Sequence, residues 1–152
     1  MRRTHVVFAA GFTMYVIRFL SFNYLLGCYT IGVLGSLLGA LLPDLDLYYK
    51  HRMTLHNIFS LTIIGLLFYA SLILLATYAG LGWIGTCAST GFILGYATHV
   101  FLDMFTIGGV SILYPFSRSR LRLARLRANS RLANFFFTVL GLFLALAALV
   151  TN

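Results

Sequence analysis

The chain has 152 residues, of which 61% are hydrophobic and 9% are charged, and its formal net charge is +8 at pH 7. Soluble globular domains carry about 25% charged residues, so this composition excludes an ordinary soluble enzyme or binding domain. It predicts an integral membrane protein instead.

Five apolar runs approach the length of about 20 residues that a helix needs to cross a bilayer. They are residues 4–20, 24–42, 55–78, 82–105 and 132–150. The first run is short and carries Arg18 near its far end, where the side chain would have to reach back to the headgroups. A secretory signal peptide is the competing interpretation of this run, but it lacks a clear small-residue cleavage site. Since the runs are continuously apolar, they favour an all-α polytopic bundle of about five helices over a β-barrel.

The basic residues between these runs predict the orientation. One pair, Arg2 and Arg3, precedes the first run, and a second pair, Lys50 and Arg52, lies between the second and third runs. Six more arginines follow the fourth run, in a basic segment at residues 117–131. A cytoplasmic N-terminus places all of these inside and leaves only Arg18 outside, as the positive-inside rule requires. We therefore expect a multi-pass protein of the plasma membrane whose C-terminus lies outside.

The acidic residues and histidines follow a pattern of their own. The sequence has three acidic residues, four histidines and no glutamate. In the predicted topology every one of them comes to the cytoplasmic face of the membrane. They are His5, Asp44, Asp46, His51, His56, His99 and Asp103. Because ionisable residues at membrane segments are costly, such a gathering indicates a functional site.

The local spacing of these residues favours a metal site. His99 and Asp103 are four residues apart, which places an imidazole and a carboxylate on one face of a helix. Pro43 should end the second helix and let Asp44 and Asp46 turn inward, and Thr54 is a plausible N-cap that would put His56 in the first turn of the third helix. Histidine and aspartate together suit Zn²⁺, Mn²⁺ or Fe²⁺.

An ion-pair cluster is the alternative interpretation. The three carboxylates could be paired with Lys50, Arg52 or Arg118 at the interface, and a histidine at a helix end often only binds a backbone carbonyl.

Four motifs then resemble a known family. They are Thr4-His5, LLPDLD at 41–46, HRMTLHN at 51–57 and GYATHVFLDMFTIGGVSILYPFSR at 95–118. These motifs are similar to those of the YdjM-like membrane-bound metal-dependent hydrolases. The third motif departs from the usual pattern, because Met53, Leu55 and Asn57 stand where the family tends to have glycine, threonine and serine.

That family is in turn similar to the zinc-dependent phospholipase C and fungal nuclease superfamily, whose all-helical enzymes cleave phosphate esters. The resemblance implies metal ligands at Asp44 or Asp46, His56, His99 and Asp103, with His5 as a further candidate. No acidic residue or histidine follows Asp103. One or two ions, with zinc favoured, are therefore expected rather than three.

The chemistry implied by a metal and these residues is the hydrolysis of a phosphoester. Asp46 or His51 could accept a proton, and Arg52 and Arg118 are suited to bidentate phosphate contacts. Thr106, Gly108 and Gly109 follow Asp103 at a turn where a substrate could approach the backbone, although a plain helix terminator is the simpler interpretation of the two glycines. Since the site would lie at the membrane interface, a lipid headgroup is the natural substrate class.

The basic segment and the small residues have simpler interpretations. Arginines alternating with leucines from Arg118 to Arg131 suit contact with anionic lipid headgroups, whereas nucleic-acid binding is disfavoured because the segment lacks aromatic residues and any known motif. Gly35, Ser36 and Gly39 predict a close helix contact. Cys28 and Cys87 lie near the outer ends of their helices, where a disulfide is conceivable but buried free thiols are favoured.

Two functions from different classes fit the sequence. One is a membrane-embedded metal-dependent hydrolase that acts on a phosphoester from the cytoplasmic side. The other is a non-catalytic membrane subunit or scaffold, with protein partners or as a homo-oligomer, in which the same residues form a structural metal or ion-pair cluster.

Overall fold

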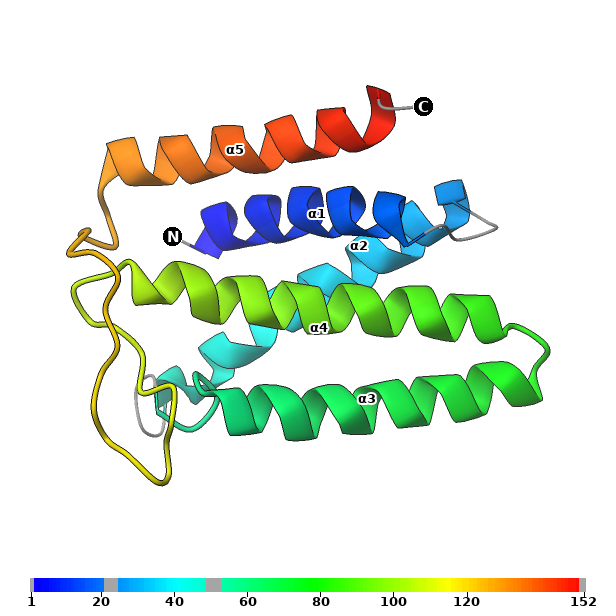
Figure 1. Ribbon diagram of the computed structural model, residues 1–152, viewed down its shortest axis with the longest axis horizontal. Coiled ribbons are helices and arrows are strands. Elements are labelled where there is room, and N and C mark those ends of the chain that lie inside the picture. Colours follow the sequence, from blue (N-terminus) through cyan, green and yellow to red (C-terminus); the bar gives the residue numbers. More distant parts are fainter. Residues whose placement is uncertain (1, 21–24, 49–52, 151–152) are drawn as a thin grey trace.

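Five long helices run back and forth along the long axis of the molecule (Figure 1). The computed structural model describes residues 2–20, 25–48 and 53–150, with only the backbone described for 46–48. The elements are α1 (Arg2–Phe19), α2 (Leu25–Leu41), the 3-10 helix η1 (Leu42–Tyr48), α3 (Ile58–Tyr78), α4 (Gly82–Met104) and α5 (Arg131–Val150). The described residues form no β-strand, only two isolated bridges. The all-α prediction is confirmed.

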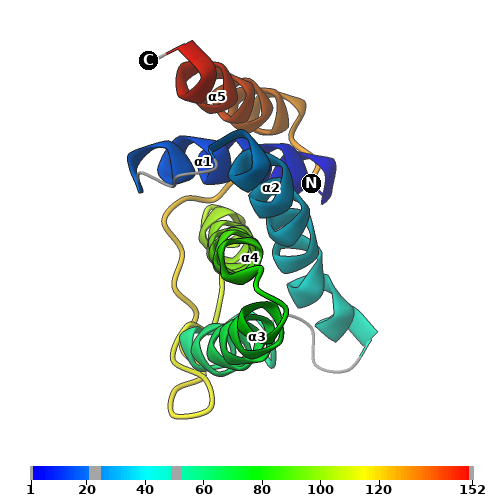
Figure 2. The same cartoon turned by 90° about the vertical axis from the view of Figure 1, so that its right-hand side faces the viewer.

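The helices differ in how much of their surface is buried. Figure 2 shows α4 at the centre of the bundle, with α1, α2 and α3 around it and α5 covering α1 on the far side.

Among the described residues, three segments are long and apolar enough to cross a membrane: Leu25–Leu45, Ile58–Tyr78 and Arg131–Val150. The helices α1 and α4 do not reach that threshold, because α1 carries three arginines and α4 is rich in glycine and in polar side chains. Their crossing of the bilayer stays a prediction.

The helices α2 and α4 make the most extensive contact in the bundle. A Cβ atom at Gly35 would overlap the backbone of Ala88, and one at Gly39 would overlap the backbone of Phe92. Small residues let helix backbones approach in this way, as the sequence predicted for Gly35, Ser36 and Gly39. This contact is confirmed, and it positions the end of α2 against the end of α4.

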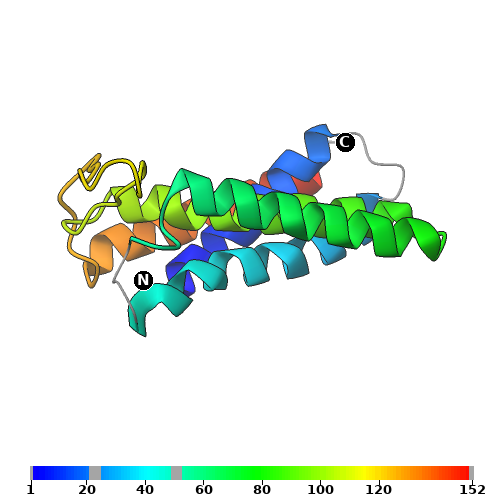
Figure 3. The same cartoon turned by 90° about the horizontal axis from the view of Figure 1, so that it is seen from below.

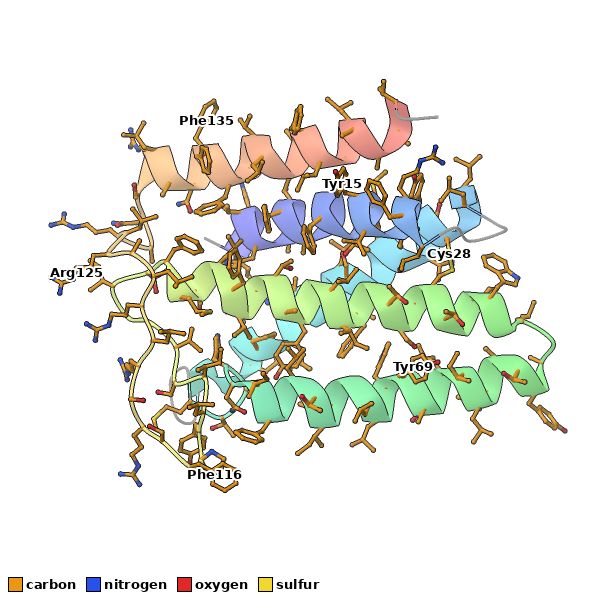
Figure 4. All side chains as sticks on the ribbon, viewed as in Figure 1. Tyr15, Cys28, Tyr69, Phe116, Arg125 and Phe135 are labelled. Carbon is orange, nitrogen blue, oxygen red and sulfur yellow. A yellow bond between two sulfur atoms is a disulfide. The ribbon has the colours of Figure 1, made fainter. Side chains whose placement is uncertain are left out.

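Cys28 of α2 and Cys87 of α4 form a disulfide, with their Cα atoms 5.2 Å apart. The expectation of two free thiols was therefore wrong. The reason is the close approach of α2 to α4, which brings the two Cα atoms within the span that a disulfide bridges. In Figure 4, Cys28 lies at the end of the bundle opposite the N-terminus.

The other end of the bundle collects several segments that are distant in sequence. Figures 1 and 3 show the start of α1, the η1 helix, the start of α3, the end of α4 and the loop to α5 at this end. The loop folds back on itself through the bridges Thr106–Leu126 and Val110–Leu121. The predicted gathering of these segments at one end is confirmed for the described residues.

Candidate metal centre

Three histidines and two aspartates meet at this end of the bundle. Each comes from a position that the sequence singled out: the first turn of α1, the η1 helix, the segment before α3 and the last turns of α4. They are His5, Asp44, His56, His99 and Asp103. They form two overlapping groups, one of His5, His99 and Asp103 and the other of Asp44, His56 and His99, and in each group the ligand atoms lie within 4.8 Å of one another.

Asp103 is the centre of this cluster. Its Oδ1 lies 3.4 Å from Nε2 of His5, and its Oδ2 lies 3.4 Å from Nε2 of His56 and 3.9 Å from Nε2 of His99. Nε2 of His99 is also 3.7 Å from Oδ1 of Asp44. Two ligands bound at about 2.1 Å in a tetrahedral arrangement are about 3.4 Å apart. The observed separations are thus close to those of a metal shell and longer than direct hydrogen bonds.

A backbone contact defines the tautomer of His99. Its Nδ1 lies 2.6 Å from the carbonyl oxygen of Ala40, at the end of α2. A carbonyl oxygen only accepts, so Nδ1 must carry the proton, and in the neutral ring Nε2 then presents a lone pair. That lone pair faces the oxygens of Asp44 and Asp103, and either a metal cation or a proton between them would relieve the repulsion. The same pattern, with one ring nitrogen on a carbonyl and the other on the metal, is usual in metal-binding histidines.

The cluster is almost completely buried. Relative exposure is 4% for His5, 0% for His56, 1% for His99 and 2% for Asp103. The rings of His5 and His99 stack with centroids 4.3 Å apart, and His56 meets His99 edge-on at 5.2 Å. Among the described members only Asp44 is open to solvent, with its side chain 20% exposed. Access to the cluster is therefore on the side of Asp44.

Asn57 holds His56 in place. It is the N-cap of α3, where its Oδ1 accepts from the backbone N–H of Ser60 at 2.8 Å. Its Nδ2 donates to the carbonyls of Met53 at 2.8 Å and Thr54 at 2.7 Å. The prediction of Thr54 as the cap was wrong, because α3 begins three residues later than expected and the asparagine makes contacts in both directions. His56 consequently lies just before the helix rather than in its first turn.

A second residue that the sequence did not single out supports the same segment. The hydroxyl of Tyr96 donates to the carbonyl of Leu55 at 2.6 Å. Tyr96 is fully buried and lies three residues before His99 on α4, so it ties the segment of His56 to the helix of His99 and Asp103. The sequence did contain a signal for this contact, because a tyrosine in the GYATH motif of an apolar helix is expected to be buried and its hydroxyl then needs a hydrogen-bond partner.

The ion pairs differ from the alternative interpretation of the sequence. Nε of Arg2 lies 3.6 Å from Oδ2 of Asp44, a partner that had not been considered. Arg118 is exposed and makes no ion pair with a described carboxylate. Lys50 and Arg52 lie outside the described residues. Asp44 therefore faces both a guanidinium at the surface and the imidazole of His99 inside.

The remaining candidates fall into two groups. His51, Arg52 and the side chain of Asp46 lie outside the described part of the chain. Thr106 is buried at the end of α4, where its hydroxyl donates to the carbonyl of Asp103 at 2.8 Å. Gly109 turns the chain with a φ of 59°, a conformation that favours glycine, and Gly108 accepts from Arg120 at 3.4 Å. These contacts explain Thr106 and the two glycines as parts of the turn after α4, and their contact with substrate stays a prediction.

A family model described as YdjM inner membrane protein matches residues 1–151. No curated protein matches the chain, and no solved structure does.

Proposed function

We infer that this chain, which belongs to the YdjM inner membrane protein family, is a membrane-embedded metal-dependent hydrolase. It would cleave a phosphoester, in a lipid headgroup or a lipid-linked phosphate, at the cytoplasmic interface. The observation that supports this proposal is the buried cluster of three histidines and two aspartates at one end of the bundle.

The donor set fits a divalent metal. Neutral imidazole nitrogens and carboxylate oxygens are ligands of Zn²⁺, Mn²⁺ and Fe²⁺, and the described cluster contains no thiolate. His5, Asp44, His56, His99 and Asp103 would hold one or two ions, most suitably zinc, and Asp46 is proposed as a further ligand. When bound, such an ion stabilises the charge that develops on a phosphoryl oxygen and activates water near neutral pH.

The chain's own residues would orient the substrate and move the proton. Arg2 is exposed and lies beside the accessible aspartate, where a guanidinium suits bidentate contact with phosphate. Arg52 and Arg118 are proposed for the same role. Asp46 and His51 are proposed as proton acceptors, because they are the remaining ionisable residues of the motifs that supply Asp44 and His56.

The location favours a lipid substrate on the cytoplasmic side. The positive-inside rule predicts that the end with the metal centre faces the cytoplasm. The disulfide between Cys28 and Cys87 supports the same orientation independently, because it lies at the opposite end and disulfides persist in oxidising compartments such as the periplasm. A multi-pass inner membrane protein with this orientation would meet headgroups of the inner leaflet.

The alternative function is a non-catalytic subunit or scaffold with a structural metal. The burial of His5, His56, His99 and Asp103 favours it, because structural metal sites are closed whereas catalytic sites keep one position open for water or substrate.

Release of phosphate from defined lipids distinguishes the two functions. Purified protein in vesicles that contain phosphatidic acid, phosphatidylglycerol phosphate or an isoprenyl phosphate should release inorganic phosphate, or a phosphorylated headgroup from other phospholipids. Asp103→Asn should abolish this release. Ser89→Ala, on the same helix, should retain it, because the buried Ser89 hydroxyl makes no hydrogen bond in the described structure. A fully metal-loaded wild type that releases nothing from any of these lipids would favour the scaffold.

A further inference from the structure

An apolar groove of about 300 Å³ lies between α1 and α4. It is lined by Phe8, Phe12, Ala97, Thr98 and Phe101. The only polar side chain among them is Thr98, whose hydroxyl donates to the carbonyl of Gly95 in its own helix at 3.0 Å. The lining therefore requires no polar partner and suits a hydrocarbon chain.

The groove is separate from the metal centre. Ala97 and Phe101 are each two residues from His99, which corresponds to about 200° around an α-helix. Both groove residues thus lie on the side of α4 that faces away from His99 and Asp103. None of the residues of the metal centre lines the groove.

Aromatic contacts continue the groove toward the end of the bundle that holds the loop. Phe8 stacks on Phe12 at 6.0 Å, and Phe8 and Phe105 both pack edge-on against Phe137, at 6.0 Å and 5.5 Å. Phe101 packs edge-on against Phe105 at 5.1 Å, one helical turn further along α4. Packed rings of this kind form a wall that exists before a ligand arrives.

The basic segment is attached where this aromatic wall ends. The backbone N–H of Leu126 donates to the carbonyl of Phe105 at 3.0 Å, and the N–H of Ile107 donates to the carbonyl of Leu126 at 3.0 Å. The side chain of Leu126 packs against the cluster that contains Phe8. Its two neighbours, Arg125 and Arg127, are exposed. Figure 4 shows Arg125 beyond the ends of α1 and α4, pointing away from the bundle.

These two arginines have no anion within the described structure. The sequence contains three acidic residues against eleven basic ones. Asp103 is buried among histidines, Asp44 faces Arg2, and neither Arg125 nor Arg127 forms an ion pair with a described carboxylate. An anion from outside the chain would complement them.

We propose that the groove, together with Arg125 and Arg127, binds an anionic phospholipid of the cytoplasmic leaflet. One acyl chain lies in the groove and the phosphate contacts the two guanidiniums, which are suited to bidentate phosphate contact. Anionic lipids of this leaflet attract basic residues next to the membrane, and a groove that also takes the chain makes the contact specific to one site. This site does not depend on hydrolysis at the metal centre.

Native mass spectrometry of the purified full chain with added lipids tests the proposal. The probes are phosphatidylglycerol and phosphatidylcholine with identical acyl chains. The wild type should retain one phosphatidylglycerol at concentrations where phosphatidylcholine is lost. Arg125→Gln with Arg127→Gln should weaken phosphatidylglycerol retention by about 30-fold. The matched pair Arg120→Gln with Arg122→Gln removes the same charge from the same segment and should have little effect.

Filling the groove tests the chain-binding part. Ala97→Leu should weaken retention of phosphatidylglycerol, and Ala97→Val should give a smaller loss with less disturbance of packing. The control is Ser71→Leu, in the apolar groove that Ile64, Leu67, Phe68, Ser71 and Leu72 line on α3. Asp103→Asn should leave lipid retention unchanged, so the outcome is independent of the hydrolase proposal. Equal retention of both lipids, equal losses from the two arginine pairs, or no effect at Ala97 would overturn the proposal.

Discussion

Replacing Asp103 with asparagine perturbs the metal centre at its most connected residue. The two oxygens of Asp103 face different partners, with Oδ1 toward His5 and Oδ2 toward His56 and His99. Asparagine has the same shape but keeps only one oxygen, and its NH₂ group presents protons. Whichever way the amide is turned, either His5 or the pair of His56 and His99 loses the carboxylate oxygen that would share an ion with it.

The size of the effect follows from this arrangement. Removal of a partner that only orients a metal ligand costs 10-fold to 100-fold in affinity. Asp103 would be a direct ligand, and its negative charge is also lost, so we expect Asp103→Asn to weaken metal binding by at least about 100-fold. Asp44→Asn should cost less, about 10-fold, because Asp44 faces only His99 within the described cluster and is partly exposed.

Metal analysis and competition with a chromophoric chelator provide the assay. The wild type and both variants are purified in detergent, loaded separately with Zn²⁺, Mn²⁺ and Fe²⁺, and compared for stoichiometry and affinity. Helix content by circular dichroism serves as the control for folding. If folded Asp103→Asn binds metal with the stoichiometry and affinity of the wild type, Asp103 is not a ligand and the reasoning from its distances is refuted.

Three further predictions concern the framework of the site. Gly91→Val should lower stability by about 1–3 kcal/mol in thermal unfolding, because a Cβ there would overlap the backbone of α2; an unchanged melting temperature would contradict this packing. Asn57→Ala should lower the free energy of unfolding by about 1 kcal/mol and should weaken metal binding. Asn57→Ser should restore the helix cap but not the metal affinity. Full recovery of metal affinity in the serine variant would contradict a role for the Nδ2 contacts. Unfolded in denaturant without reductant, the wild type should resist thiol alkylation and Cys28→Ser should expose one alkylatable Cys87, because both cysteines are buried in the folded chain; alkylation of both cysteines of the wild type would contradict the disulfide.

Much of the fold could be predicted from local sequence properties. Apolar runs and their basic flanks gave helices that match α2, α4 and α5 to within one residue at either end. The third helix was predicted to begin at residue 55, whereas α3 begins at Ile58. Thr54 and Asn57 are both good capping residues, and only tertiary contacts decide between them. The disulfide was not predicted, because the approach of two helices depends on their packing angle and not on the position of each cysteine.

The side chains of the candidate site could be predicted better than their supports. His5, Asp44, His56, His99 and Asp103 were identifiable because ionisable residues are rare and costly in such a chain. The carbonyl of Ala40 could not be identified, since a backbone group carries no signal of its own in the sequence. Arg2 was counted only as a topological charge, although it lies beside Asp44. Whether a basic residue forms an ion pair or only sets the orientation of the chain in the membrane depends on which helix ends lie next to each other.

X-ray absorption at the metal edge of the wild-type protein in membranes tests the central claim most directly. The account predicts stoichiometric metal with nitrogen and oxygen ligands at about 2.0–2.2 Å, imidazole scattering from more than one histidine and no sulfur ligand. Absence of bound metal after Zn²⁺, Mn²⁺ and Fe²⁺ have each been supplied, or a shell that contains sulfur or no imidazole, would contradict it.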